Sequence, residues 1–269
     1  MAAQDNLDAQ SHAIHKQRSY RVEAVVLRHS DWGEADRLLV LYTLEMGKLR
    51  ALAKGVRRPR SRKAGHLEPF TRVNLLLAQG RDLPIITQAE MIESHLPLHE
   101  NLRAMGYAAY IVELLDRFTY EEGENVALYR LLADTLERLC SEPDPAFVVR
   151  YYEIRLLDLV GFRPQLSQCV GCGKPILPED QYFSAAHGGL VCPKCSAKVP
   201  GVRAITVAAV RFLRHMQRSS YPEAARLPLK ESADDELEHL MQHYFTYLLE
   251  RGLNTPAFLS LIDKKGVVR

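Results

Sequence analysis

The sequence predicts an α+β protein of several domains: a small β-barrel, then an all-α helical domain, with a four-cysteine module inserted among the helices. Short β-branched and apolar runs fill residues 20–90, and apolar residues recur at helical spacing after His95. Two Cys-x-x-Cys pairs interrupt the helical pattern between residues 163 and 200. With 269 residues the chain is long enough for two or three domains.

Five strands are predicted in the N-terminal part, over residues 20–28, 37–44, 48–54, 70–79 and 83–90. A short hairpin loop ending at Gly47 joins the second strand to the third, and Pro84 places the start of the fifth strand at a sheet edge. A long connection follows the third strand. This arrangement is typical of the OB-fold barrel, and an SH3-like barrel is the alternative.

Apolar periodicity predicts helices over residues 100–118, 124–140, 144–160, 206–219 and 234–251. The third helix has the clearest ends. Asp144 can cap it, Pro145 suits its first position, and Gly161 ends it. Gly252 is a stop signal for the last helix.

These elements predict a division of the chain into six segments. We expect a disordered leader over 1–19, an OB-fold barrel over 20–95, the first part of the helical domain over 96–162, a zinc-binding insertion over 163–200, the second part of the helical domain over 201–254, and a C-terminal tail over 255–269.

Four cysteines form the most specific motif. Cys169 and Cys172 are separated by nineteen residues from Cys192 and Cys195, which is the spacing of a structural site for one zinc ion. Four thiolates would complete a tetrahedral shell and leave no open position for catalysis. Two disulfides in a secreted protein are the alternative for these pairs, and His187 is an alternative ligand.

Several functional classes lack their signals. Residues 1–19 are polar, without the apolar core of a signal peptide, and no apolar run is long enough to cross a bilayer. The fifth cysteine, Cys140, is expected to be a small buried residue. No P-loop, dinucleotide fingerprint or nucleophile elbow is present. The sequence therefore predicts a cytoplasmic protein that is not an enzyme.

Charge is segregated along the chain although the net charge is only +2. Residues 46–67 contain eight lysines and arginines and no acidic residue, whereas residues 111–145 contain nine acidic residues and three arginines. Segregation of this kind indicates a polyanionic partner for the basic part.

The basic residues gather in the connection between the third and fourth strands, residues 54–65. Gly55, Pro59 and Gly65 disfavour a helix there, so we expect an extended backbone with its cations spread along it. Arginine binds phosphate through two hydrogen bonds, and lysine adds a point charge. Trp32, in a loop before the second strand, and Tyr42 are candidates for stacking on bases. The predicted DNA-binding residues are Arg37, Lys48, Arg50, Lys54, Arg57, Arg58, Arg60, Arg62 and Lys63.

Three pieces of sequence, in this order, resemble the RecO family of bacterial DNA repair proteins. They are VVLRHSDWGEADRLLVLYT, then GKLRALAKGVRRPRSR followed by LEPF, and then GFRPQLSQCVGCG with YFSAAHGGLVCPKC. The resemblance extends over about residues 20–251.

The resemblance implies a recombination mediator that binds single- and double-stranded DNA, anneals complementary strands, and helps to load the recombinase RecA at gaps. It also implies that the protein is nucleoid-associated. Its implied partners are RecR and the single-strand-binding protein, whose acidic tail the helical domain can receive. The candidate residues for that tail form two sets: Arg117, Arg130 and Arg138, or Arg203, Arg211, Arg214 and Arg218.

Two other functions remain open from the residues themselves. One is a zinc-containing protein-interaction adaptor with incidental nucleic-acid contact. The other is a zinc-dependent nucleic-acid enzyme, against which the closed thiolate shell argues.

Overall fold

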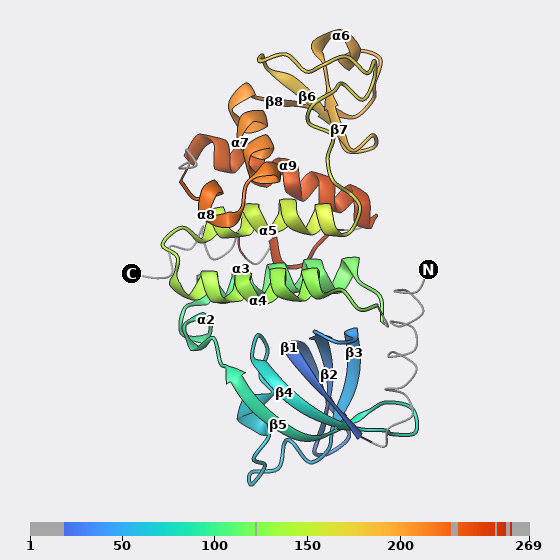
Figure 1. The fold of residues 1–269 in the computed structure, drawn as a ribbon, viewed down its shortest axis with the longest axis vertical. Helices are drawn as coiled ribbons and strands as arrows, with labels where there is room; N and C mark the ends of the chain where they lie inside the picture. The colour runs from blue at the N-terminus through green and yellow to red at the C-terminus, as the bar shows by residue number, and fades with distance from the viewer. Residues whose placement is uncertain (1–18, 122, 227–230, 251, 257–258, 260–269) are drawn as a thin grey trace, which may run out of the picture. The chain divides into compact units, whose positions relative to one another are not determined.

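The computed structural model describes residues 19–121, 123–226, 231–250, 252–256 and 259 (Figure 1). The chain divides into two compact units. Unit 1 comprises residues 1–101 and 119–140, and unit 2 comprises residues 102–118 and 141–269. Residues 1–18 of the leader predicted over 1–19 lie outside the described residues, as do residues 257–258 and 260–269 of the tail predicted over 255–269. Within the described part, no helix is long and apolar enough to span a membrane.

The described residues of unit 1 form a five-stranded, OB-like sheet, drawn in blue to teal in Figure 1. The strands are β1 (Ser19–Trp32), β2 (Asp36–Thr43), β3 (Gly47–Ala53), β4 (Arg72–Ala78) and β5 (Ile85–Glu93). They pair in the order β1-β2-β3-β5-β4, and β1 also pairs with β4. This Greek-key order is that of an OB fold and excludes the SH3-like alternative.

The seam between β3 and β5 is narrow. It consists of one parallel pair, Leu52 with Ile85, and a hydrogen bond from the Leu52 N–H to the Pro84 carbonyl oxygen of 2.9 Å. All the other strand pairs are antiparallel and longer. The predicted five strands are thus confirmed in the form of an OB-like sheet, which is a partly open form of barrel.

Alternation along the strands builds the core of unit 1. Inward-facing residues of all five strands are buried together, and residues from both ends of the long β3–β4 connection join them. The members are Val22, Ala24, Val26, Leu39, Leu41, Ala51, Ala53, Val56, Leu67, Val73, Leu75, Leu77 and Ile86.

Two strand predictions were wrong at their ends. β1 continues to Trp32 instead of ending at Arg28, because residues 28–32 pair with residues 36–40 across the hairpin. Trp32 is therefore the last residue of a strand rather than part of a loop. β5 continues to Glu93, because its end pairs with Arg72 of β4.

The described residues of unit 1 also form three helical segments: η1 (Ala64–His66), α2 (Leu96–Glu100) and α4 (Val126–Ser141), whose last residue is in unit 2. The Tyr129 hydroxyl of α4 donates to Glu23 of β1 at 2.8 Å. Glycine is required at position 47, because φ is +66° there and a Cβ atom would lie 1.9 Å from the Gly123 carbonyl oxygen.

Unit 2 contains the helices α3 (Leu102–Phe118), α5 (Pro145–Leu159), α7 (Val207–Arg218), α8 (Tyr221–Ala224) and α9 (Glu231–Leu249). α5 contacts α3, α7 and α9. As predicted, Asp144 caps α5 by accepting a hydrogen bond from the Phe147 N–H at 3.1 Å, and Gly161 follows its end with φ of +85°.

A small antiparallel sheet follows α5 in unit 2. Its strands are β6 (Gln181–Ser184), β7 (Gly189–Val191) and β8 (Val202–Ile205), in the order β7-β6-β8, and the short helix α6 (Pro193–Ser196) lies between β7 and β8. β8 lies beyond residue 200, so the sheet extends past the range predicted for the cysteine insertion.

An ionic cluster is buried among the helices of unit 2. The Tyr110 hydroxyl donates to one carboxylate oxygen of Glu153 at 2.5 Å, and Arg150 donates to the other at 2.7 Å. Burial raises the pKa of Glu153 to about 7, although Arg150 and the Tyr110 hydroxyl act in the opposite direction. The sequence pattern alone did not indicate this cluster.

Candidate metal centre and nucleic-acid interface

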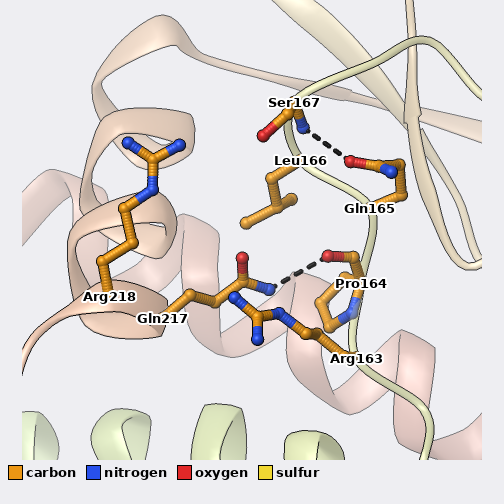
Figure 2. A pocket seen from close by; sticks show the side chains of 7 residues that line it. All are labelled: Arg163, Pro164, Gln165, Leu166, Ser167, Gln217 and Arg218. Carbon is orange, nitrogen blue, oxygen red and sulfur yellow. Dashed lines mark hydrogen bonds between the residues drawn. The ribbon is translucent and has the colours of Figure 1, made fainter.

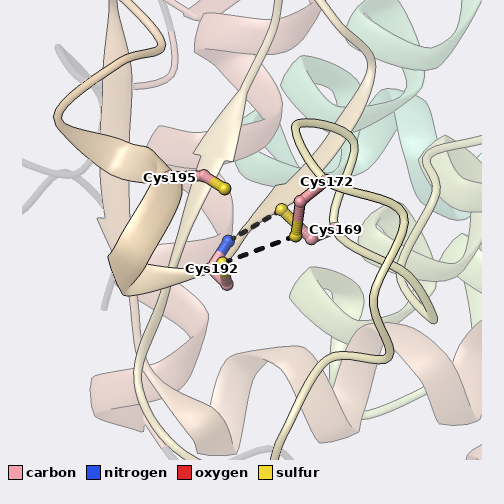
Figure 3. A group of neighbouring side chains, drawn as sticks. All are labelled: Cys169, Cys172, Cys192 and Cys195. Carbon is pink, nitrogen blue, oxygen red and sulfur yellow. Dashed lines mark hydrogen bonds between the residues drawn. The ribbon is translucent and has the colours of Figure 1, made fainter.

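Two turns bring the four cysteine thiols of unit 2 to one point (Figure 3). All four sulfur atoms lie within 4.8 Å of one another, and the Sγ atoms of Cys172 and Cys192 are 4.0 Å apart. A tetrahedral zinc ion with four bonds of about 2.3 Å requires sulfur atoms that are ~3.8 Å apart. The four thiols therefore fit a single metal ion.

The backbone around the first pair favours the thiolate form. The Cys192 N–H donates to the Cys169 sulfur at 3.3 Å. Burial acts to raise the pKa of Cys169, but hydrogen bonds from Cys192, Gly171 and Cys172 outweigh it and lower this pKa. Gly171 also permits the close approach of the two turns, since a Cβ atom there would lie 3.2 Å from the Cys195 Cβ atom.

The alternative ligand and the fifth cysteine lie outside this cluster. The His187 ring nitrogen Nδ1 is hydrogen bonded to the Ser184 hydroxyl at 3.0 Å. Cys140 belongs to unit 1, is half-buried, and donates its thiol hydrogen to the Leu136 carbonyl oxygen. Burial raises the pKa of Cys140, which keeps it in the unreactive thiol form. All five cysteines are free, so the disulfide alternative is not supported.

The basic loop of unit 1, residues 54–71, is held to the sheet at both ends. Val56 and Leu67 are buried in the core, and the Gly55 N–H donates to Asp36 at 2.7 Å. The backbone between these anchors is a series of turns that includes η1. The predicted extended loop was therefore wrong, because the burial of Val56 and Leu67 bends the chain back onto the sheet.

Four cations project from this loop into solvent. Within the described residues, no carboxylate or carbonyl oxygen forms a hydrogen bond or ion pair with any of their side chains. They are Lys54, Arg58, Arg60 and Arg62.

The other predicted DNA-binding residues have partners inside unit 1. Arg37 pairs with Glu68 at 2.9 Å, and Arg57 pairs with Asp31 at 3.2 Å. The remaining three make contacts with the segment before α4 or with the sheet. These contacts are Arg50 with Glu121 at 2.5 Å, Lys48 with the Thr119 carbonyl oxygen at 3.2 Å, and Lys63 with the Ile86 carbonyl oxygen at 2.8 Å.

A hollow of about 360 Å³ lies at the base of the loop, lined in part by Arg37, Arg57, Arg58 and Glu68. Burial acts to raise the pKa of Glu68, but hydrogen bonds from Arg37 and His29 outweigh it and lower this pKa. Glu68 therefore remains ionised and balances part of the arginine charge.

The two aromatic candidates for base stacking differ in exposure. Trp32 is 52% exposed at the end of β1, and Arg57 donates to the carbonyl oxygens of Gly33 and Glu34 next to it. Tyr42 is 1% exposed, and burial raises its pKa to about 12. The prediction for Tyr42 was wrong, because its side chain is buried, on the face of β2 opposite the core residues Leu39 and Leu41.

The arginines considered for an acidic tail also divide by their contacts. Arg117 pairs with Glu113, Arg138 pairs with Asp134, and Arg214 donates to the Leu166 carbonyl oxygen. The remaining residues of both sets are exposed: Arg130, Arg203, Arg211 and Arg218.

Comparison with known proteins identifies the family. Residues 18–95 match the family model described as recombination protein O N terminal, and residues 99–257 match the model described as recombination protein O C terminal. The chain belongs to the RecO family. Family membership implies a role in DNA repair by recombination.

Curated relatives resemble the chain over most of its length. A DNA repair protein RecO of Desulforudis audaxviator is 38% identical over 93% of this chain and 98% of its own. The protein of the same name from Roseiflexus sp. is 37% identical over 91% of this chain and 86% of its own, and that of Dehalococcoides mccartyi is 34% identical over 94% and 99%. These names describe DNA repair proteins and indicate no enzymatic activity.

The acidic partners of the basic residues in unit 1 were not predicted from the sequence. Asp31, Glu68 and Glu121 each pair with an arginine that was predicted to contact DNA. Glu68 directly follows the acid-free stretch in sequence, which is a signal that its charge could return to it. Asp31 lies well before that stretch, so its pairing with Arg57 has no such signal. Glu121 is about seventy residues from Arg50, and only the fold brings these two side chains together.

Proposed function

We propose that this RecO-family protein binds single- and double-stranded DNA through the basic loop of unit 1 and anneals complementary strands during recombination repair. The observation that carries the proposal is that Lys54, Arg58, Arg60 and Arg62 are exposed, with no hydrogen-bond or ion-pair partner among the described residues. An unpaired arginine can bind phosphate without first breaking an internal contact.

The mechanism is electrostatic. Cations on the loop neutralise backbone phosphates and release counterions, which makes binding sensitive to salt and insensitive to sequence. Because the contacts are to phosphates, the bases stay free to pair. Neutralising part of the charge on each strand lowers the repulsion between two strands, so pairing can begin without ATP.

The cations with internal partners have a second role in this proposal. Arg57 holds the β1–β2 hairpin through Asp31 and two carbonyl oxygens, and Lys63 holds the loop to β5. Arg37, Lys48 and Arg50 extend the positive face around the loop. Trp32 supplies a stacking surface for a base beside it.

The proposed metal is one structural zinc ion held by Cys169, Cys172, Cys192 and Cys195. Four thiolates match the preference of zinc for sulfur ligands in closed sites. Such an ion supplies folding energy to its module, and all of its coordination positions are filled by protein. The proposal therefore assigns no catalytic step to this protein.

The proposed partners are RecR and the single-strand-binding protein, and through them the recombinase RecA. Family membership supports these partners. The exposed arginines that suit an acidic tail are Arg130 in unit 1 and Arg203 and Arg211 in unit 2.

The experiment compares the wild type with the double variant Arg58→Ala/Arg60→Ala in DNA binding and strand annealing over a salt series. Loss of two phosphate contacts should flatten the slope of log K against log salt by about 1.4 for single strands and about 1.8 for duplex. Annealing should fall with binding. The control is Arg21→Ala/Arg81→Ala, which removes the same charge from exposed positions of unit 1 outside the loop.

Arg57 is left intact in this test, because its loss would also release the hairpin that it holds. If the loop variant binds and anneals like the wild type, the DNA site lies elsewhere and the proposal is wrong. An equal loss in the control variant would mean that net charge, and not the loop, determines binding.

A further inference from the structure

A hollow of about 240 Å³ in unit 2 lies between the segment that follows α5 and the C-terminal end of α7 (Figure 2). Its walls carry two arginines, several neutral polar groups and, within the described part of the chain, no carboxylate. The lining residues are Arg163, Pro164, Gln165, Leu166, Ser167, Gln217 and Arg218.

Two neighbouring arginines already satisfy backbone groups near this hollow. Arg214 donates from Nε to the Leu166 carbonyl oxygen at 2.8 Å. Arg155 donates to the carbonyl oxygens of Gln217 and Ser219, each at 3.3 Å. The end of α7 and the 163–167 segment are thus held in place without Arg163 or Arg218.

Arg163 and Arg218, which line the hollow, are not needed to hold the end of α7 and the 163–167 segment in place. Arg218 is exposed and has no hydrogen-bond or ion-pair partner among the described residues. The Arg163 side chain is 51% exposed and pairs with Asp158 at 3.3 Å. The side chains of Arg163 and Arg218 flank the space from different elements, and the buried Gln217 lies between them (Figure 2).

Neutral donors complete the lining. The Gln217 amide donates to the Pro164 carbonyl oxygen at 3.0 Å, and the Gln165 side-chain oxygen accepts from the Ser167 N–H at 2.9 Å. These contacts leave the Ser167 hydroxyl and the Gln165 amide N–H groups available as donors. Two cations and two neutral donors suit an anion with several oxygen atoms.

We propose that this hollow binds one phosphate group of a DNA backbone, and so gives unit 2 its own contact with DNA. This inference rests on the proposed function, since it adds a second phosphate contact to the same activity. The volume of the hollow limits the size of its ligand. Sites for drug-sized molecules measure about 300–1,000 Å³, and this hollow of about 240 Å³ is smaller. It therefore suits one phosphate group rather than a whole nucleotide.

Phosphate fits better than a peptide carboxylate. A phosphodiester presents two charged oxygen atoms, which Arg163 and Arg218 can meet from two sides. A carboxylate also shares one charge between two oxygen atoms, and arginine can bind either anion through two hydrogen bonds. The tetrahedral phosphodiester differs because it directs its oxygen atoms to more sides of the hollow than a planar carboxylate does.

The test measures binding of an unphosphorylated oligothymidine to the full-length, metal-loaded protein over a salt series. Arg163→Ala/Arg218→Ala should weaken binding several-fold and flatten the salt slope by about 0.7, the value for one phosphate of a single strand. The control is Lys198→Ala/Arg226→Ala, which removes two exposed cations of unit 2 that do not line the hollow. Its salt slope should stay closer to that of the wild type.

Inorganic phosphate is the second probe, because the same chemistry could serve a free anion. Phosphate could raise the thermal transition of the wild type but not that of Arg163→Ala/Arg218→Ala, while the variant binds DNA like the wild type. That result would support the phosphate site and identify free phosphate as its ligand. Identical behaviour of the variant and the wild type with both probes would overturn the inference. The inference would also be overturned if Arg163→Ala/Arg218→Ala lost binding to an acidic peptide and kept its binding to DNA and phosphate.

The loop variant of unit 1 separates this inference from the proposed function. If Arg58→Ala/Arg60→Ala retains DNA binding while Arg163→Ala/Arg218→Ala loses it, the loop assignment fails and the hollow stands. The opposite pattern leaves the loop as the DNA site and rejects the hollow as a contact with DNA. Unchanged metal content and thermal transition in the variant show that the fold is intact.

Discussion

The two units of the molecule use ionisable side chains in opposite ways. In unit 1, Lys54, Arg58, Arg60 and Arg62 project into solvent without partners among the described residues. In unit 2, Arg150 and Glu153 are buried against each other, and four thiols converge on one point. The difference indicates that charge in the loop of unit 1 is available for binding, whereas charge in the interior of unit 2 maintains the fold.

The physical reason is the cost of desolvation. A surface cation loses little when it exchanges water for phosphate, so it can bind reversibly. A buried charge is costly unless it is paired, so the interior of unit 2 tolerates Arg150 because Glu153 lies 2.7 Å away. Substitutions should therefore change binding in the loop and stability in the interior.

The largest expected effect is loss of the metal. Cys169→Ser, or treatment with a strong chelator, should remove zinc and lower the thermal transition of unit 2, because structural zinc in small modules contributes on the order of 10 kcal/mol. Metal analysis and calorimetry measure the two effects. Cys140→Ser is the matched control, since it also removes a thiol but lies outside the cluster.

This prediction also tests the contrast between the units. DNA binding through the loop of unit 1 should survive the loss of metal better than the stability of unit 2 does. A wild-type protein that carries no metal and is equally stable in chelator would show that the four cysteines have another role.

The next effect is a pH dependence in unit 2 that originates at Glu153. Burial raises the folded-state pKa of Glu153 to about 7, above about 4.3 for an unfolded chain. Its contribution to stability is therefore complete below pH ~4.3 and is lost as the pH rises through about 7. Between pH 4.3 and 7, the free energy of unfolding should fall by roughly 2–3 kcal/mol because of this group.

Glu153→Gln removes this titration, so the stability of the wild type relative to the variant should fall between pH 4.3 and 7. Denaturant unfolding at a series of pH values measures the difference. Glu179→Gln, at an exposed position of unit 2, is the control. A difference that stays constant across this range would mean that Glu153 is ionised throughout as the partner of Arg150.

The smallest effect is expected in unit 1, from Trp32→Ala. A stacked base contributes about 1–3 kcal/mol, so affinity for single strands should fall by roughly tenfold. The salt slope and the thermal transition should stay unchanged, because the side chain is uncharged and 52% exposed. Tyr120→Ala, which removes a ring that is 88% exposed in the same unit, is the control. Equal affinity of the Trp32 variant and the wild type would remove stacking from the proposal.

Local patterns predicted most of the elements. The five strands follow from alternation, the cap at Asp144 follows from the Asp-Pro pair, and the cysteine cluster follows from its spacing. The errors occur where pairing with another strand or burial in the core decides the outcome. β1 is extended by pairing with β2, and the basic loop is bent because two of its residues are buried in the core.

By itself, the sequence determined that this protein has a basic loop after its third strand and four cysteines that can share a metal ion. Both features follow from residues that are close together in the chain or regularly spaced. Only the tertiary structure decided which cations are free and which are paired, since Arg50 meets Glu121 and Arg57 meets Asp31 through folding. The same holds for the buried pair of Arg150 and Glu153, because burial depends on which helices pack together and not on the spacing of residues along one helix.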